Sequence, residues 1–149
     1  MSACLLDVNV LVALAWPSHV HHAQAHAWFN AHAADGWATC PLTQLGFVRI
    51  SSHPRIIPEA VSPRQALQLL AQMTRMDRHV FWPDDLSLDD RHIPADLIMG
   101  HRQFTDAYLV GLAMRKGGRL VTFDAALISL LPSRHPRKDV VEVISTERS

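Results

Sequence analysis

The sequence is poor in cysteine and has no long hydrophobic run. Its 149 residues include only Cys4 and Cys40, and neither thiol has a ligand-like spacing to another cysteine or to a histidine. We therefore expect buried free thiols and no disulfide framework. No apolar run approaches the ~20 residues that a membrane-spanning helix needs, and the N-terminus has neither a basic leader nor a small-residue cleavage site. These absences predict a cytoplasmic chain with no membrane association.

The sequence also lacks net charge and is poor in lysine. Its 14 lysines and arginines balance 14 aspartates and glutamates, so overall charge does not favour binding to nucleic acid. Any contact with RNA must then come from local patches. Arginine supplies 12 of the 14 cations, since Lys116 and Lys138 are the only lysines. The planar guanidinium suits phosphates and exposed bases, but a genome rich in G and C explains this preference equally well.

What the sequence does contain is a regular alternation of segments with strand and helix character. With 48% hydrophobic residues and no internal repeat or linker, residues 1–149 are expected to form a single domain. The predicted strands are residues 2–7, 37–40, 79–82, 120–123 and 140–144. The predicted helices are 9–15, 19–34, 41–51, 63–75 and 105–116, with short helices at 87–91 and 125–130 and loops around Pro94, around Gly100 and at 134–138. This alternation predicts an α/β/α sandwich whose central, mostly parallel sheet has four or five strands.

Three aspartates stand at the edges of apolar segments. Asp7 follows the first predicted strand, Asp106 begins the long apolar helix, and Asp124 follows the strand at 120–123. An ionised carboxylate beside buried apolar residues is costly unless something compensates it. If the strands ending at Asp7 and Asp124 are neighbours, their tips lie roughly 4.8 Å apart. We therefore expect Asp7, Asp106 and Asp124 to share one acidic pocket.

Such a pocket is typical of a site for a hard divalent cation. Mg²⁺ prefers oxygen ligands and binds through one or two carboxylates together with waters and substrate phosphates. This ligand set points to phosphodiester chemistry, in which an activated water attacks the phosphorus and no serine, cysteine or histidine nucleophile is needed.

Four blocks in this order resemble the PIN-domain ribonucleases, and more narrowly the VapC-type toxins of bacterial toxin–antitoxin pairs. The blocks are residues 5–14 (LLDVNVLVAL), 38–49 (ATCPLTQLGFVR), 105–109 (TDAYL) and 120–124 (LVTFD). The resemblance implies a PIN-like fold, and metal-binding or catalytic roles for Asp7, Asp106 and Asp124. It further implies Mg²⁺ or Mn²⁺ as the cofactor, cleavage of RNA with tRNA as a plausible substrate, a homodimer, and inhibition by a small VapB-like antitoxin.

The second block departs from the family pattern. Many family members have a glutamate where this chain has Gln44, which we nevertheless count among the candidate catalytic residues. Its amide can ligate a metal or hold a water, but the pocket loses one negative charge. We expect one well-held metal ion in place of two, or weaker binding overall.

Two other functions remain open on the sequence. A non-enzymatic module that keeps the fold is consistent with the neutral Gln44. A phosphatase of the haloacid-dehalogenase type would use Asp7 as its nucleophile, but it would need an acid at Asn9 and a well-placed lysine, for which Lys116 is the only candidate.

Several further side chains have structural and functional interpretations. The histidine cluster at residues 19–32 is expected on a solvated helix face, and the acidic stretch from Asp84 to Asp90 in a solvated loop. The tryptophans are expected in packing roles. Functional contacts remain open for Asn9, Arg49, His101 and Arg102.

Overall fold

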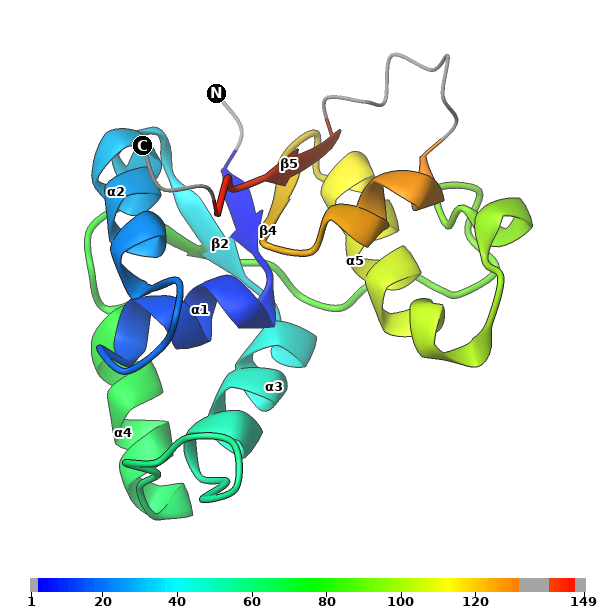
Figure 1. Cartoon of the computed structure of the whole chain (residues 1–149). Helices are drawn as coiled ribbons and strands as arrows, with labels where there is room; N and C mark the ends of the chain where they lie inside the picture. The colour runs from blue at the N-terminus through cyan, green and yellow to red at the C-terminus, as the bar shows by residue number, and fades with distance from the viewer. Residues whose placement is uncertain (1–2, 132–139, 147–149) are drawn as a thin grey trace.

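The structure is a computed structural model that describes residues 3–131 and 140–146. Its centre is a sheet of five strands in the order β3-β2-β1-β4-β5, and each described pairing is parallel (Figure 1). The strands are β1 (Cys4–Leu6), β2 (Trp37–Thr39), β3 (His79–Phe81), β4 (Arg119–Thr122) and β5 (Val141–Val143). The predicted α/β sandwich is confirmed. Because β1 lies in the middle and strand order reverses there, the carboxyl ends of β1 and β4 are the expected place for a site.

Helices cover both faces of this sheet, as a parallel sheet requires. The α-helices are α1 (Val8–Ala15), α2 (His22–His32), α3 (Pro41–Ser51), α4 (Pro63–Thr74) and α5 (Phe104–Arg115). Short 3₁₀ helices are η1 (Ala33–Asp35), η2 (Ala95–Leu97), η3 (His101–Gln103) and η4 (Ala125–Leu130). In Figure 1, α1 to α4 lie on one side of the molecule and α5 lies on the other with η2, η3 and η4. None of the described helices combines the length and the apolar character needed to cross a bilayer.

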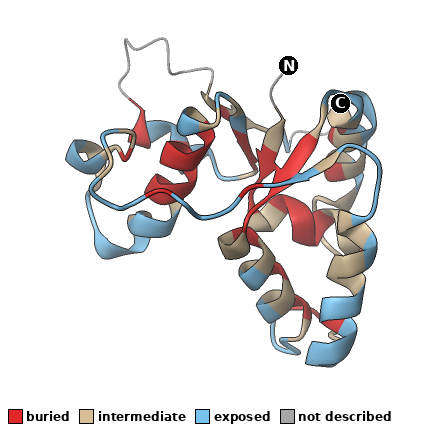
Figure 2. Cartoon of the chain, turned by 180° about the vertical axis from the view of Figure 1, so that it is seen from behind, coloured by how far each residue is buried: buried red, intermediate tan, exposed pale blue. Residues whose placement is uncertain are grey.

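Each face of the sheet has its own hydrophobic core. Successive residues of a strand point to opposite faces, so Leu5 packs with the residues of α5 while Leu6 packs with those of α1 and α2. The same division separates Leu120 from Val121 in β4. Figure 2 shows the buried residues concentrated in the strands and in the middle of α5. All four tryptophans are buried, which confirms their packing role: Trp16, Trp28, Trp37 and Trp82.

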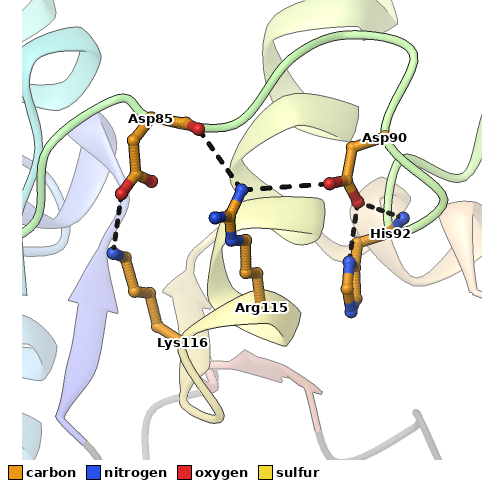
Figure 3. Close-up of polar contacts among 5 residues, drawn as sticks. All are labelled: Asp85, Asp90, His92, Arg115 and Lys116. Atoms are coloured by element: carbon orange, nitrogen blue, oxygen red, sulfur yellow. Dashed lines mark hydrogen bonds and ion pairs between the residues drawn. The ribbon is translucent and has the colours of Figure 1, made fainter.

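The long helix α5 is buried on all sides along most of its length. Residues 107–113 are buried without interruption, as expected for a helix that is apolar all round. Ion pairs with the preceding loop fix its C-terminal end (Figure 3). Lys116 lies 3.4 Å from a carboxylate oxygen of Asp85, and Arg115 donates to the Asp85 carbonyl at 3.2 Å. Asp90 accepts from the backbone N–H of His92 at 2.8 Å, and its other carboxylate oxygen lies 3.9 Å from Arg115.

The acidic loop is largely solvated, as predicted. Asp84, Asp85 and Asp89 are exposed, and Asp85 and Asp90 also pair with the cations at the end of α5. The short helix predicted at 87–91 is absent, and these residues form turns. A local reason is that the Asp90 side chain hydrogen-bonds the backbone two residues ahead, which competes with helix formation. Beyond it, η2 and η3 replace the predicted loop around Pro94 and Gly100.

The histidine cluster also differs from its prediction. The predicted helix at 19–34 begins only at His22, after turns that include a hydrogen bond from the His21 N–H to the His19 ring at 3.0 Å. The His22 and His26 rings are half-buried and lie 2.7 and 2.8 Å from the carbonyl oxygens of Ala13 and Leu14. Those carbonyls end α1 and have no partner within the helix. The solvated-face interpretation is therefore wrong, because these histidines cap α1.

Smaller details of the prediction hold in part. Both cysteines are free thiols, as expected, but only Cys40 is buried and Cys4 is half-buried. The last strand is found at Val141–Val143, within its predicted range. The predicted basic loop at 134–138 lies outside the described residues.

The end of α5 provides a test of packing at a glycine. The chain leaves α5 by a Schellman motif, with Gly117 at φ 68° and the Gly118 N–H donating to the Ala113 carbonyl at 2.9 Å. A Cβ added at Gly118 would lie 2.4 Å from the Ala3 carbonyl oxygen, which belongs to the backbone. We predict that Gly118→Ala lowers the free energy of unfolding by about 1–3 kcal/mol in urea denaturation.

Gly100→Ala is the matched control, because nothing lies within 4 Å of a Cβ at that position. Its stability should stay within about 0.5 kcal/mol of the parent chain. Equal effects of the two substitutions would contradict the packing argument.

Candidate active site

The ends of β1 and β4 bring two of the predicted acids to the same edge of the sheet. The strands are adjacent, with Leu6 paired to Val121, and the Asp7 N–H extends the ladder by donating to the Val121 carbonyl at 2.9 Å. Asp7 caps the N-terminus of α1, and Asp124 caps η4 through the Ala126 N–H at 2.9 Å. Both acids therefore have the capping role that explains the local chain direction, in addition to their position at the strand ends.

Asp7 is the most enclosed of the three acids, with 7% of its surface exposed. One carboxylate oxygen accepts from the Val8 N–H at 2.8 Å, and the other accepts from the Thr122 hydroxyl at 2.8 Å. Burial raises the pKa of Asp7, these two hydrogen bonds oppose the rise, and the charge of Asp124 adds to it. The carboxylate is consequently held in one orientation but is poorly compensated in charge.

Thr122 is a residue of the candidate site that the sequence analysis did not identify. Its buried hydroxyl donates to Asp7 and accepts from the Asn9 amide at 3.2 Å and from the Asp124 N–H at 3.0 Å. The Asn9 carbonyl oxygen in turn accepts from the Phe123 N–H at 3.2 Å. The one signal in the sequence is a hydroxyl at the end of an apolar strand, two residues before an aspartate. Asn9 thus forms hydrogen bonds to Thr122 and Phe123 at the end of β4, and the residue that caps α1 is Asp7.

Asp106 enters from the first turn of α5 and is half-buried. Burial, and after it the charges of Asp7 and Asp124, together raise the pKa of Asp106 to about 6. These charge effects indicate that Asp106, which comes from a separate segment, lies within electrostatic reach of Asp7 and Asp124. No lysine or arginine of the described chain forms an ion pair with any of them.

The residues at this edge fit a divalent cation in charge and ligand type. They offer several carboxylate oxygens, and a bound cation would relieve the repulsion that raises the pKa of Asp106. Within residues 3–131 and 140–146, however, no three His, Cys, Asp or Glu side chains already stand in the arrangement of a metal-ligand group. The charges of Asp7 and Asp124 thus act on Asp106, but the three carboxylates are not yet arranged as ligands of one metal ion.

Gln44 forms its hydrogen bond with Thr39 and not with the three aspartates. It lies in the first turn of α3, and its amide nitrogen donates to the Thr39 hydroxyl at 3.0 Å. Thr39 also lies 2.7 Å from the His79 ring. In the described part of the chain, Gln44 has no hydrogen bond to Asp7, Asp106 or Asp124. A role for Gln44 in the site stays a prediction.

The basic candidates are exposed. His101 and Arg102 form part of η3, directly before α5. Arg49 lines an open hollow on α3 with His53 and Ile56, and it makes no salt bridge within the described residues.

Comparison with known proteins agrees with this geometry. The sequence pattern of the PIN domain matches residues 4–130, which cover the sheet from β1 to β4, all five α-helices and the three aspartates. The chain therefore belongs to the PIN-domain family.

Its relatives place it in the VapC group of that family. The chain is 52% identical to ribonuclease VapC38 of Mycobacterium tuberculosis over 130 residues, which cover 87% of this chain and 91% of the relative. It is 52% identical to ribonuclease VapC39 over 128 residues, covering 83% and 89% of the two chains, and 45% identical to ribonuclease VapC44 over 124 residues, covering 83% and 87%. Both of these relatives are from the same organism.

The Thr122 network predicts a specific cost of removing one hydroxyl. Thr122→Val keeps the shape of the side chain but leaves the buried Asp7 oxygen, the Asn9 amide and the Asp124 N–H without their shared partner. We expect the free energy of unfolding to fall by about 3 kcal/mol in urea denaturation.

Thr122→Ser is the control, because it keeps the hydroxyl and loses only a methyl group. It should cost about 1 kcal/mol. If the valine and serine variants were equally stable, the hydroxyl would not be the source of the stability.

The raised pKa of Asp106 predicts how stability depends on pH without metal. Because the folded chain binds this proton more tightly than the unfolded chain, the free energy of unfolding should fall as pH rises from 3.8 towards about 6. Asp106→Asn removes this contribution. In thermal denaturation with EDTA present, the variant should be more stable than the parent above the folded-state pKa, and the difference should disappear below 3.8.

Asp89→Asn serves as the reference for that experiment, since Asp89 is exposed and outside the site. Its stability should follow that of the parent chain over the whole pH range. If the stability of Asp106→Asn changed with pH in the same way as the stability of the parent chain, the proposed repulsion would be refuted.

Proposed function

We propose that this chain is a metal-dependent endoribonuclease that acts as a VapC-type toxin. The observation that carries the proposal is that Asp7 and Asp124 follow the adjacent strands β1 and β4 and that the charges of both raise the pKa of Asp106 in the first turn of α5. None of the three acids has an ion pair within the described residues. The names of the relatives support the same activity, since each is called a ribonuclease.

The cofactor that we propose is Mg²⁺ or Mn²⁺, held by Asp7, Asp106 and Asp124. When bound, such an ion would neutralise the charge that develops on the phosphate oxygens and lower the pKa of an attacking water. The side chains divide the remaining tasks. Asp7 is held in place by Val8 and Thr122, so it supplies a ligand of fixed orientation. Asp106 enters from the first turn of α5 and is half-exposed, so it supplies a ligand from the helix side of the site.

Gln44 completes the proposed catalytic set as a neutral member. With an amide at this position the site has three negative charges, and we propose that it holds one metal ion in place of two. The hydrogen bond to Thr39 uses the amide nitrogen of Gln44, and its oxygen makes no hydrogen bond within the described residues. That oxygen is the atom we assign to a water or to the substrate.

The partners that we propose follow from membership of the VapC group. They are an RNA substrate, with tRNA as a plausible target, a VapB-like antitoxin that inhibits cleavage, and a second copy of the chain in a homodimer. The cytoplasm is the compartment in which we propose that the protein acts, since its RNA substrate is there.

The competing functions have less support. A haloacid-dehalogenase-type phosphatase would need a lysine beside Asp7, but Lys116 is at the opposite end of α5 from Asp106 and is paired with Asp85 (Figure 3). A binding module without activity is consistent with the absence of a preorganised ligand group in the described residues. The cleavage experiment separates this module from the enzyme.

We predict that the purified chain cleaves RNA only when a divalent metal ion is present. Incubation of total RNA with Mg²⁺ should give discrete fragments, and EDTA should abolish them. Asp7→Asn and Asp106→Asn should lower the cleavage rate by about 10²- to 10⁴-fold, because each removes a carboxylate from the site. Gel analysis and mapping of the RNA ends would measure the rate and identify the target.

Asp96→Asn is the matched control, since Asp96 is exposed in η2, outside the carboxylate cluster. It should cleave at the parent rate. Cleavage that persists in EDTA, or that Asp7→Asn leaves unchanged, would overturn the proposed function.

A further inference from the structure

A chain of hydrogen bonds links the edge strand β3 to Gln44 in α3. The Thr39 hydroxyl at the end of β2 accepts from the Gln44 amide nitrogen at 3.0 Å and lies 2.7 Å from Nε2 of His79 in β3. His79 pairs with Trp37 in the adjacent strand, and alternate residues of a strand share a face, so His79 and Thr39 are on the same face of the sheet. Two strands and a helix thus contribute to one chain of contacts.

The two strand residues of this chain are held in place. Only 1% of the Thr39 surface is exposed, so its hydroxyl proton needs an acceptor inside the protein. The His79 ring packs edge-on against Trp37, with ring centroids 4.7 Å apart, and the Trp37 Nε1–H donates to the Asp77 carbonyl at 3.3 Å. The positions of the ring and the hydroxyl are therefore fixed by the core.

The hydrogen bonds of this chain have one direction. Burial lowers the pKa of His79, so the ring is neutral at pH 7, and a hydrogen bond with the Thr74 backbone opposes this decrease. A hydrogen bond that favours the protonated ring is one that the ring donates. Neutral His79 therefore carries its proton on Nδ1 and has a lone pair on Nε2. The Thr39 hydroxyl donates to that lone pair, and its oxygen accepts from Gln44.

Neutral His79 thereby decides which end of the Gln44 amide faces Thr39. If the amide were turned by half a rotation, its carbonyl oxygen would take the place of its nitrogen. Thr39 has a single proton and would then face two acceptors, of which one would have no donor. An unpaired polar group at a buried position is costly. The amide nitrogen is therefore held at Thr39, and the amide oxygen is left free.

Gln44 lies beside the start of α1, the helix that Asp7 caps. The neighbouring parallel strands β1 and β2 lead directly into α1 and α3, so both helices begin at the same edge of the sheet. The helices are in close contact there, since a Cβ added at Gly46 would lie 2.5 Å from Cγ2 of Val8, the residue after Asp7. Gln44 precedes this contact by two residues, and it thus belongs to the edge of the sheet that carries Asp7.

We propose that His79 and Thr39 are positioning residues, which hold the Gln44 amide nitrogen and leave its oxygen free for a water or the substrate. Both residues act through Gln44. The use of that oxygen in cleavage rests on the proposed function, whereas the orientation of the amide does not.

The proposal implies a response of Gln44 to protonation of His79. A protonated imidazole donates from both nitrogens, so Thr39 would accept from His79 and its hydroxyl would be free to donate to Gln44. The amide would then turn its oxygen to Thr39. The charged groups that line the hollow beside His79 are Asp35, Arg78 and Lys116, and the pKa of His79 is set by burial and the Thr74 backbone in place of these charges.

The first test follows the Gln44 amide by NMR, without metal or RNA. In spectra of the full chain, neutral His79 should have its proton on Nδ1, and the side-chain NH2 signals of Gln44 should shift with pH at the midpoint of the His79 ring. His79→Gln keeps an acceptor in place of Nε2 but does not titrate, so these signals should then stay at their neutral-pH positions. Gln44 signals that do not respond when His79 titrates would overturn the proposal.

The second test measures cleavage of RNA with Mg²⁺. Thr39→Val keeps the shape of the side chain but removes the hydroxyl that holds Gln44. We expect kcat to fall roughly tenfold with KM unchanged, as for other residues that orient a catalytic group. Thr39→Ser keeps the hydroxyl and should restore kcat. Urea denaturation of Thr39→Val verifies that the variant is folded under the assay conditions.

A second histidine provides the matched control. His32 is half-buried like His79, and its ring stacks on Trp28 with centroids 4.7 Å apart, but it lies at the end of α2 and has no printed contact with Gln44. His79→Ala should lower kcat and His79→Gln should rescue it, because only the glutamine supplies an acceptor for Thr39. His32→Ala should change neither kcat nor the Gln44 signals.

The outcomes separate this inference from the proposed function. If the parent chain cleaves RNA but Thr39→Val and His79→Ala cleave at its rate, the two residues do not position a catalytic group and only this inference fails. If the parent chain does not cleave RNA, the proposed function fails, and the NMR titration still decides whether His79 sets the orientation of Gln44.

Discussion

The candidate site depends on one buried hydroxyl, that of Thr122. It joins the end of β1 to the end of β4 by donating to Asp7 and accepting from Asn9 and from the Asp124 N–H, so its donor and both acceptor positions are used. The two strands that it joins are adjacent in the sheet but far apart in the sequence. Without this bond, a buried carboxylate would lose one of its two hydrogen bonds in a setting where unpaired polar groups are expensive. The position of the acids thus follows from satisfying the polar groups at the strand ends.

The second constraint is the burial of α5 on all sides. Because residues 107–113 are enclosed by the core, the first turn of the helix has little freedom, and Asp106 is held near the other two acids. The ion pairs of Arg115 and Lys116 with the loop before η2 fix the opposite end. Packing energy from the two cores therefore holds together carboxylates that repel each other. This is a frequent arrangement where a protein must bind a cation, because the repulsion is relieved on binding.

Much of the fold was predictable because it depends on local patterns. Apolar segments bounded by prolines and polar residues predicted the strands and the main helices, and the acids at their edges predicted the candidate site. The failures share a physical cause. The histidines of α2 appeared solvated because nothing in their spacing shows that His22 and His26 reach the last carbonyls of α1. In the same way, the Asp90 side chain converts a predicted helix into turns through a contact with His92.

The sequence by itself determined the layered architecture and the identity of three candidate acids, since periodicity and the cost of a charge beside apolar residues are both local properties. Tertiary structure alone decided which groups meet at the site. It placed Thr122 at the centre of the network, turned the Gln44 amide nitrogen towards Thr39, and brought Asp106 close enough to Asp7 and Asp124 for their charges to raise its pKa. Hydrogen bonds and charge interactions act over a few ångströms in space. Residues more than a hundred positions apart can therefore be partners only once the sheet has formed.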